Sequence, residues 1–329
     1  MAQRGGGGKI RRRALPAPPP GPKQPPARGG GMNEHSRGYL ITGGGVLILS
    51  PDALLIRLLG DAPWNILFWR GLGFALVVLL VVALRHGRNL PAACRAVGPP
   101  GLVIGPLFAV GTVFFVLSIT HTSVANTLVI IATSPLFAAL LSFVMMGEML
   151  AFSTALAIMA GLLGVVVTVW GSLGEGRLLG DLAALGTAVC MALNFTLIRR
   201  ARARDLMPVY ALSGLLITLA ALPFAEPFAF TGIQWAWLAL LVLLVHPVAF
   251  LLITLGPRYL SAPEVSLLML LETVFGPLWV WLALGERPPD GTLLGGAVIL
   301  GALAANAAWR LRAVRLRRSS LACPGGGGA

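Results

Sequence analysis

Charged residues are scarce in this chain of 329 residues, because Asp, Glu, Lys and Arg together make up only 11% of it. An ordinary soluble domain contains about 25% of these residues. Apolar residues make up 57%, and the mean hydropathy is +0.84. A soluble globule cannot bury that much apolar surface, and a disordered chain would carry far less of it. The composition therefore predicts that most of the chain lies in a membrane.

Cysteine is equally scarce, with three residues in the whole chain: Cys94, Cys190 and Cys323. Their number is odd and no two of them form a CxxC pair. This spacing argues against a disulfide framework, a zinc ribbon and an iron–sulfur site. We therefore expect neither a metal site nor a cofactor.

Several catalytic and energy-coupling motifs are absent from the sequence. No GxxxxGK[ST] segment marks an ATP-driven pump of the P-loop kind, and no HExxH segment marks an intramembrane metalloprotease. No paired His and Asp accompanies a serine as in nucleophilic catalysis. These absences predict a protein that is not an enzyme. An integral membrane enzyme acting on a lipid-linked substrate stays open as the alternative, and it would need polar residues clustered at one membrane interface.

Long apolar runs dominate what is present. A helix that crosses the hydrocarbon needs about 20 apolar residues, and ten runs of this kind follow one another, joined by short connections with Gly, Pro, Arg or Asp. The sequence predicts an all-α integral membrane protein with ten transmembrane helices. The expected spans are 39–59, 64–84, 99–119, 122–146, 152–171, 179–198, 208–224, 235–255, 262–284 and 291–309.

Clusters of arginine occupy alternate connections between these runs. The connections after the second and sixth runs are rich in arginine, as is the C-terminal tail from Arg310, whereas the opposite side carries Arg177 and Arg287. Because cytoplasmic loops are enriched in Lys and Arg, we expect a multi-pass protein of the inner or plasma membrane with both termini cytoplasmic. This distribution accounts for the net charge of +13 without a nucleic-acid partner.

The two ends of the chain differ in composition from the apolar middle. Residues 1–36 are basic and rich in Pro and Gly, and residues 311–329 are basic and then rich in Gly. Neither segment has apolar surface to bury, so we expect a disordered N-terminal tail and a cytoplasmic C-terminal tail. No short apolar stretch with a cleavage site marks a secretory signal, and we expect residues 1–31 to be dispensable.

The two halves of the apolar region resemble each other. An offset of 138 positions brings Gly147-Glu148 onto Gly285-Glu286, at the same point of the fourth and ninth runs. A unit of five spans is odd, so its second copy enters the membrane from the opposite side, as in the inverted repeats of many secondary transporters. The predicted repeats cover 37–172 and 173–310. The same offset pairs Ser123 with Ser261, Phe137 with Phe275 and Thr154 with Thr292, and a similar one pairs Asp52 with Asn194.

The residues around the glycine–glutamate pairs carry a family resemblance. The segment from Ser134-Pro135 through Gly147-Glu148, with Gly161 and Gly164 after it, resembles the EamA repeat of the drug/metabolite transporter superfamily. A second copy runs from Glu272 through Gly285-Glu286 to Gly295-Gly296. The resemblance implies a transporter, typically an exporter or exchanger of small metabolites, with a central cavity between the halves.

The resemblance also implies roles for motif residues. Glu148 and Glu286 end their spans, and a structural role is favoured for both, in which they close the helix end and bond the next loop. In one departure from the repeat, Thr273 stands where the first copy has Pro135, and the proline is displaced to Pro277. The two halves therefore need not bend alike.

Ionisable residues inside membrane spans are costly and normally face protein or a water-filled cavity. Glu272, near the middle of the ninth run, either binds a proton or a cationic substrate, or forms a structural ion pair. Asp52 follows Pro51 in the first run and either pairs across helices with Arg57 or Arg70, or leaves an arginine to bind an anionic substrate. Arg57 lies five residues beyond Asp52, on a different face of one straight helix.

Three further polar residues are candidates for the transport path. His246 precedes Pro247 in the middle of the eighth run, where the proline frees a carbonyl one turn earlier. Its imidazole either faces the cavity or makes a structural hydrogen bond. Asn126 and Glu264 occupy matching positions near the starts of the fourth and ninth runs and are candidate gate or lining residues.

These observations lead to one functional prediction. With no energy-coupling domain, the chain is expected to be a secondary transporter that moves a small metabolite by alternating access, through export or exchange. Dense small residues in the fifth and tenth runs allow close packing either within the bundle or across a homodimer face. The residues predicted for the substrate or proton path are Asp52, Arg57, Arg70, Asn126, His246, Glu264 and Glu272.

Overall fold

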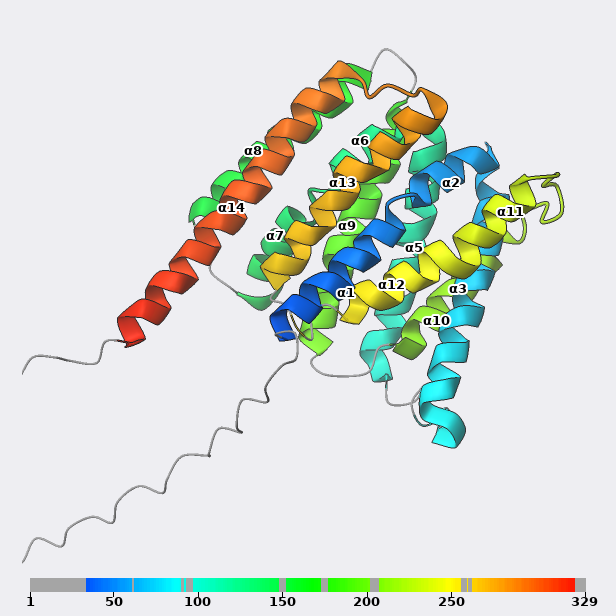
Figure 1. Ribbon diagram of the computed structural model, residues 1–329, viewed down its shortest axis with the longest axis horizontal. Helices are drawn as coiled ribbons and strands as arrows, with labels where there is room; N and C mark the ends of the chain where they lie inside the picture. Colours follow the sequence, from blue (N-terminus) through cyan, green and yellow to red (C-terminus); the bar gives the residue numbers. More distant parts are fainter. Residues whose placement is uncertain are drawn as a thin grey trace, which may run out of the picture. The chain divides into compact units, whose positions relative to one another are not determined.

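The computed structural model describes most of the chain beyond its N-terminal tail (Figure 1). Glu148 lies outside the described residues, as does the side chain of Glu264, and so do the tail up to residue 33 and the last seven residues of the chain. The described ranges are 34–60, 62–89, 92, 97–147, 152–172, 177–201, 207–255, 259 and 262–322.

All regular structure in these ranges is helical. Eight helical stretches are long and apolar enough to cross a membrane, and two shorter apolar helices, Met207–Ala221 and Leu268–Leu284, complete the predicted set of ten. The elements of the first half are α1 (Glu34–Leu49), α2 (Asp52–Leu59), α3 (Pro63–His86), η1 (Gly87–Asn89), α5 (Gly98–His121), α6 (Val124–Ile131), α7 (Ser134–Met146) and α8 (Phe152–Ser172). Those of the second half are α9 (Leu178–Ala201), α10 (Met207–Ala221), α11 (Gln234–Ala239), η2 (Leu240–Val245), α12 (His246–Leu255), α13 (Ala262–Leu284) and α14 (Asp290–Ala322).

Three of the ten spans are irregular near their middles. Ser50 and Pro51 separate α1 from α2, because a proline has no N–H to donate and its ring clashes with the preceding turn. The break places Asp52 in the first turn of α2, where the positive end of the helix dipole favours a carboxylate. The fourth span is interrupted between α6 and α7, before Pro135, and the eighth contains the π-helical turn η2 just before His246.

Helices of one half pack against their counterparts in the other. α3 lies along α10, and α8 lies along α14 (Figure 1). A Cβ atom on Gly71 would lie 2.6 Å from the carbonyl oxygen of Gly214, and one on Gly214 would lie 2.7 Å from that of Gly71. Gly164 and Gly295 meet backbone to backbone in the same reciprocal way. These paired contacts relate each helix to the one five spans later, as expected for two repeats.

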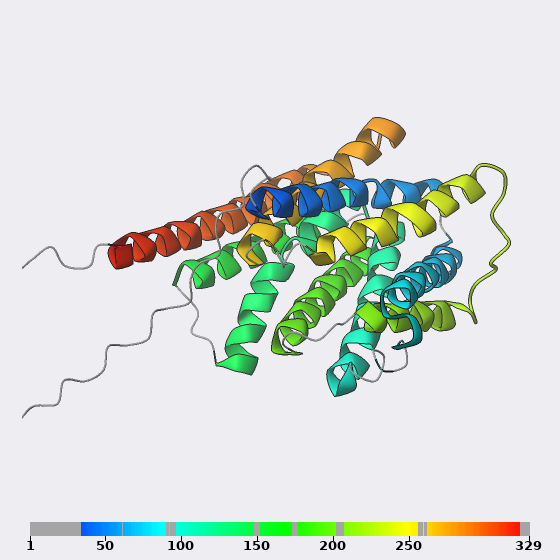
Figure 2. The same ribbon diagram turned by 60° about the horizontal axis from the view of Figure 1, so that its bottom comes forward.

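Contacts between helices that are not counterparts of each other also occur in both versions that the repeat predicts. α1 packs along α12, where the blue and yellow helices lie side by side (Figure 1 and Figure 2). The counterpart of that contact, between α9 and α5, is also made. An all-α fold of ten spans in two inverted five-helix repeats is thus confirmed.

The motif glycines end equivalent helices with the same backbone geometry. Gly147 follows α7 with φ +66° and donates its N–H to the carbonyl of Phe143 over 3.1 Å. Gly285 follows α13 with φ +70° and donates to the carbonyl of Trp281 over 2.9 Å. Residues other than glycine rarely adopt this left-handed conformation, which explains the residue type at both positions.

Candidate functional site

A buried arginine on α3 connects the two halves of the molecule. Nη1 of Arg70 donates to Oδ1 of Asp52 over 2.8 Å, and its Nη2 donates to Nδ1 of His246 over 2.9 Å. Asp52 is 1% exposed, Arg70 4% and His246 6%. We refer to these three residues as the Arg70 cluster. Asp52 and Arg70 come from the first half, and His246 comes from α12 in the second.

The hydrogen bonds of Arg70 determine the protonation state of His246. A guanidinium group has only donors, so Nδ1 of the imidazole must accept and cannot carry a proton. The ring is therefore neutral, with its hydrogen on Nε2. Nδ1 also lies 3.8 Å from Oδ1 of Asp52, which is too far for a hydrogen bond.

Aromatic rings enclose the Arg70 cluster. The guanidinium carbon of Arg70 lies 5.5 Å from the ring centre of Phe115, which is within cation–π range. The ring of Phe74 lies 4.8 Å from that of His246 and 5.3 Å from that of Phe250. Because these rings keep water away, the charges of Asp52 and Arg70 attract each other more strongly than they would at a surface.

Two buried polar atoms of the cluster have no partner among the described residues: Oδ2 of Asp52 and Nε of Arg70. Buried polar groups in proteins are nearly always hydrogen-bonded, so unpaired ones call for an explanation such as a missing ligand or water. The cluster therefore has one acceptor and one donor to offer.

Glu272 lies beside this cluster on α13. Its side chain is partly buried, it makes no hydrogen bond with a described residue, and the charges of Asp52 and Arg70 both act on its carboxyl group. When Glu272 is ionised, the two acids outnumber the single arginine. The site then carries an excess negative charge at the middle of the ninth span.

A second polar group lies at the far end of the first span. Nη2 of Arg57 donates to the carbonyl of Thr122 over 2.6 Å and to Oε1 of Glu286 over 3.3 Å. The same Oε1 accepts from the backbone N–H of Val124 over 3.4 Å. Glu286 thus bonds helices α2 and α6, and the bond to its own following loop that the resemblance implies stays a prediction. An open pocket of about 290 Å³, the Arg57 pocket, is lined by Arg57, Thr120, His121, Thr122, Arg177 and Glu286.

Asn126 takes part in a buried network next to this group. Its Nδ2 donates to Oδ1 of Asp181 over 3.2 Å, and the hydroxyl of Thr122 donates to the same oxygen over 2.7 Å. The hydroxyl of Thr292 donates to Oδ1 of Asn126. Sequence reasoning missed Asp181. The signal for it was an acidic residue in the first turn of a span, in a chain with few acids.

The predicted site residues thus fall into separate groups. Asp52, Arg70 and His246 meet, with Glu272 beside them, whereas Arg57 pairs with Glu286 instead of Asp52. Pro135 lies in the first turn of α7, and Gly147 and Gly285 cap their helices. The roles predicted for these residues, and for Glu148 and Glu264, stay predictions.

The second repeat has neutral residues where the first has its ion pair. Asn194, the sequence counterpart of Asp52, donates its Nδ2 to the carbonyl of Ile104 over 3.1 Å. Gly71 and Gly214 occupy equivalent positions in the two repeats, so the residues before them, Arg70 and Ser213, are counterparts. The hydroxyl of Ser213 donates to the carbonyl of Val209 over 2.9 Å. The ion pair is therefore not required by the repeat fold.

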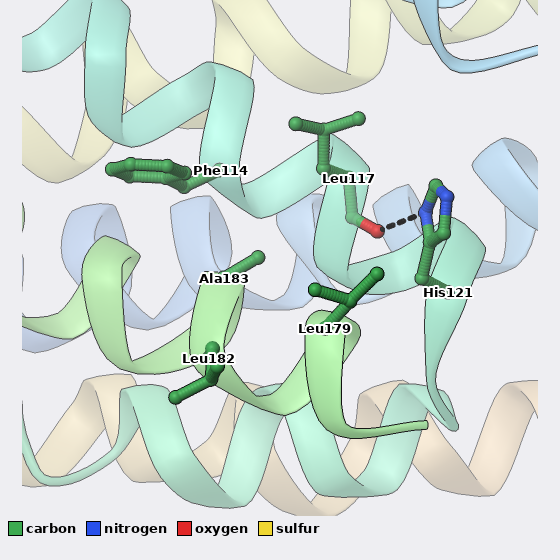
Figure 3. Close-up of a pocket in the computed structure, with 6 residues that line it drawn as sticks. All are labelled: Phe114, Leu117, His121, Leu179, Leu182 and Ala183. Carbon is green, nitrogen blue, oxygen red and sulfur yellow. Dashed lines mark hydrogen bonds between the residues drawn. The ribbon is translucent and has the colours of Figure 1, made fainter. Parts of the chain in front are cut away.

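A larger pocket lies between α5 and α9 and differs in character (Figure 3). Its volume is about 350 Å³, and its only polar side chain is His121, whose Nδ1–H donates to the carbonyl of Leu117 over 2.8 Å. Its rim is exposed, since Leu179 is 73% and Leu182 54% exposed. We refer to this pocket as the α5–α9 groove; it is lined by Phe114, Leu117, His121, Leu179, Leu182 and Ala183.

Comparisons with known proteins agree with this architecture. The model of the EamA-like transporter family matches residues 38–170 and again 178–307. An uncharacterized transporter of Archaeoglobus fulgidus is 29% identical over 231 residues, which cover 67% of this chain and 81% of that protein. A solved protein crystal structure matches 83% of this chain and 97% of its own with a TM-score of 0.61 at 21% identity, a likeness of fold alone.

Proposed function

The chain belongs to the EamA-like transporter family, and from this premise we propose that it is a secondary transporter working by alternating access. It is an integral, multi-pass membrane protein. Its cargo in this proposal is a small metabolite, which it exports or exchanges. The two five-helix repeats, 37–172 and 173–310, rock about a site near the middle of the bilayer.

The Arg70 cluster is the observation that carries this proposal. Asp52, Arg70 and His246 each lie well inside a span rather than at its ends. Burying an ion pair in a membrane is costly, and such residues commonly mark substrate or ion pathways. Their position inside the spans, where the two repeats meet, favours movement across the bilayer over catalysis on a lipid-linked substrate.

The pairing of Arg57 with Glu286 supports one conformation of the proposed cycle. This ion pair connects α2 with the segment after α13. The backbone N–H of Val124 donates to the same carboxylate, so α6 is bonded there as well. With both termini in the cytoplasm of an inner or plasma membrane, as the arginine distribution favours, this end faces outward. In this proposal the pair helps to hold the outer end of the transporter together.

Transport by purified protein tests the proposal directly. The full chain in liposomes is screened against a panel of radiolabelled organic acids, amines, amino acids and nucleosides, with and without a pH gradient. We expect saturable uptake of at least one class. Correctly inserted protein that moves no member of the panel faster than empty liposomes would contradict the proposal.

The variant Glu272→Gln then tests whether Glu272 belongs to the proposed substrate or proton path. This change removes the unpaired acid beside Arg70 while keeping its shape, so transport should fall at least tenfold while the melting temperature stays unchanged. Glu226→Gln, the same chemical change in a connecting segment away from the cluster, is the matched control. Equal transport by both variants would remove Glu272 from the mechanism.

A further inference from the structure

The break in the first span leaves one buried acceptor unused. Pro51 frees the carbonyl of Leu47, and the hydroxyl of Ser50 donates to it over 2.8 Å. The same hydroxyl accepts the indole N–H of Trp279 over 2.9 Å. Oδ1 of Asp52 belongs to the ion pair described above, whereas Oδ2 of Asp52 is buried and accepts from no described residue. A buried acceptor of this kind calls for a donor from a ligand or a water molecule.

One face of α13 is turned toward this break. Glu272, Gly276 and Trp279 are spaced at i, i+4 and i+7, so they lie on the same face of the helix. Trp279 donates to Ser50, and a Cβ atom on Gly276 would lie 3.8 Å from the carbonyl oxygen of Ser50. Glu272 lies one turn from Gly276 on this face, and the charge of Asp52 reaches its carboxyl group. The carboxylate of Glu272 and Oδ2 of Asp52 therefore belong to one buried site.

The charge balance of this site rests on Glu272. Asp52 and Arg70 neutralise each other, and His246 is neutral because its Nδ1 accepts from Arg70. Of the other elements that pack against α13, α6 carries no ionisable side chain, and those of α1 and α14 lie near the ends of their spans. An ionised carboxylate at this depth is costly without a counter-charge. One monovalent cation therefore balances the site.

The same arrangement disfavours an anionic ligand. Arginine binds a carboxylate or a phosphate best through two parallel hydrogen bonds. Both terminal nitrogens of Arg70 are already engaged, one by Asp52 and one by His246, so that only Nε is left. An anion at that single donor would also lie beside the carboxylates of Asp52 and Glu272. Repulsion between like charges is strong where water is excluded.

We propose that the site binds a primary organic ammonium ion, whose N–H groups donate to the carboxylate of Glu272 and to Oδ2 of Asp52. A primary ammonium has three N–H donors, whereas a quaternary ammonium has the same charge and no donor. The rest of the ligand is apolar, because aromatic rings such as those of Phe74 and Phe115 surround the cluster. This inference rests on the proposed function, since it names the substrate class of the same site.

Binding is measured on the purified full chain in a neutral detergent by isothermal titration calorimetry, and the heat of titrating empty micelles is subtracted. The probes share a phenyl ring on a short chain and differ in their polar group: phenethylamine, its trimethylated derivative, phenylalanine and 3-phenylpropionate. We expect phenethylamine to bind best, and the trimethylated ion to bind at least tenfold more weakly because it has no N–H. Phenylalanine should bind more weakly than phenethylamine, and 3-phenylpropionate should not bind.

Variants at Glu272 test its charge separately from its shape. Glu272→Gln keeps the shape and removes the charge, so phenethylamine binding should fall at least tenfold while the melting temperature stays unchanged. Glu272→Asp keeps the charge on a shorter side chain and should retain more binding than Glu272→Gln. Glu226→Gln, in an exposed connecting segment, is the matched control and should change binding less than twofold. The comparison of the probes on the unaltered chain needs no variant to fold.

Three results would overturn the proposal. Absent phenethylamine binding, or equal affinity for its trimethylated derivative, would remove the role of the N–H donors. Tighter binding of phenylalanine or 3-phenylpropionate than of phenethylamine would make this a site for carboxylates, and unchanged binding by Glu272→Gln would place the ammonium elsewhere. None of these measurements involves transport. Uptake of another substrate class without amine binding would refute this inference alone, whereas amine binding without uptake of any class would refute the proposed function alone.

Discussion

The two repeats place different chemistry at equivalent points of their helices. The first has Asp52 and Arg70 bonded over 2.8 Å, whereas the second has Asn194 and Ser213, each bonded to a nearby backbone carbonyl. The neutral arrangement buries no charge, so its desolvation cost is lower. The fold therefore tolerates either solution, and the costly one in the first repeat points to a demand other than stability.

The largest difference in stability between the repeats is expected when one partner of the ion pair is removed. Arg70→Gln leaves Asp52 buried without its cation, and such losses cost about 3–5 kcal/mol. Ser213→Ala, the counterpart change, removes one neutral hydrogen bond worth about 1 kcal/mol. Unfolding of the detergent-solubilised variants measures both. A loss for Arg70→Gln no larger than that for Ser213→Ala would show that Asp52 is not dependent on its partner.

Giving the first repeat the neutral chemistry of the second should separate stability from function. Asp52→Asn combined with Arg70→Gln removes both charges together, so most of the stability lost in Arg70→Gln should return. Transport in liposomes should nevertheless stay at least tenfold below wild type. If the double variant transports normally, the pair is only a structural ion pair, which is the alternative that the sequence left open.

Placing an acid at the equivalent position of the second repeat should lower the stability of the protein. In Asn194→Asp the side chain loses the N–H that Ile104 accepts and turns a carboxyl group toward a carbonyl oxygen. A buried acceptor left without its donor costs about 1–3 kcal/mol. Asn194→Ala, which loses the same bond but adds no acid, is the matched control for the unfolding measurement. The acid should be the more harmful of the two.

The smallest difference in stability loss between the repeats is expected at their glycine caps, which have the same geometry. Gly147→Ala and Gly285→Ala each force a side chain into a left-handed conformation, which costs about 1–2 kcal/mol. Because the two caps share φ values and hydrogen bonds, the two losses should match within error. Unfolding of the single variants tests this, and markedly unequal losses would mean that the caps differ in ways their geometry does not reveal.

Local patterns in the sequence were sufficient to predict the helices and to name Arg70 as one of two candidate partners of Asp52, but they did not predict the contacts with the second half. The apolar runs predict the spans, because length and composition alone decide whether a helix can cross a membrane. The five-residue spacing of Asp52 and Arg57 correctly argues against their pairing in one helix. The bond between Arg70 and His246 joins residues far apart in sequence, and no local rule encodes it.

Asp181 shows a second reason why sequence reasoning fell short. An acid in the first turn of a helix is ordinarily explained by the helix dipole, so it attracted no attention. Its partners, Thr122 and Asn126, lie at the junction between two other spans and become its neighbours only through helix packing. Hydrogen-bonding residues of this kind are recognised only once the helices are placed.

The glycine contacts between counterpart helices have a mechanical consequence. At Gly71 with Gly214, and again at Gly164 with Gly295, the backbones approach so closely that neither glycine has room for a Cβ atom. The side chains of Ile299 and Thr168 close over the second of these contacts, so the two helices are held tightly at this distance. In the proposed alternating access, these two close contacts keep counterpart helices together while the rest of each repeat moves.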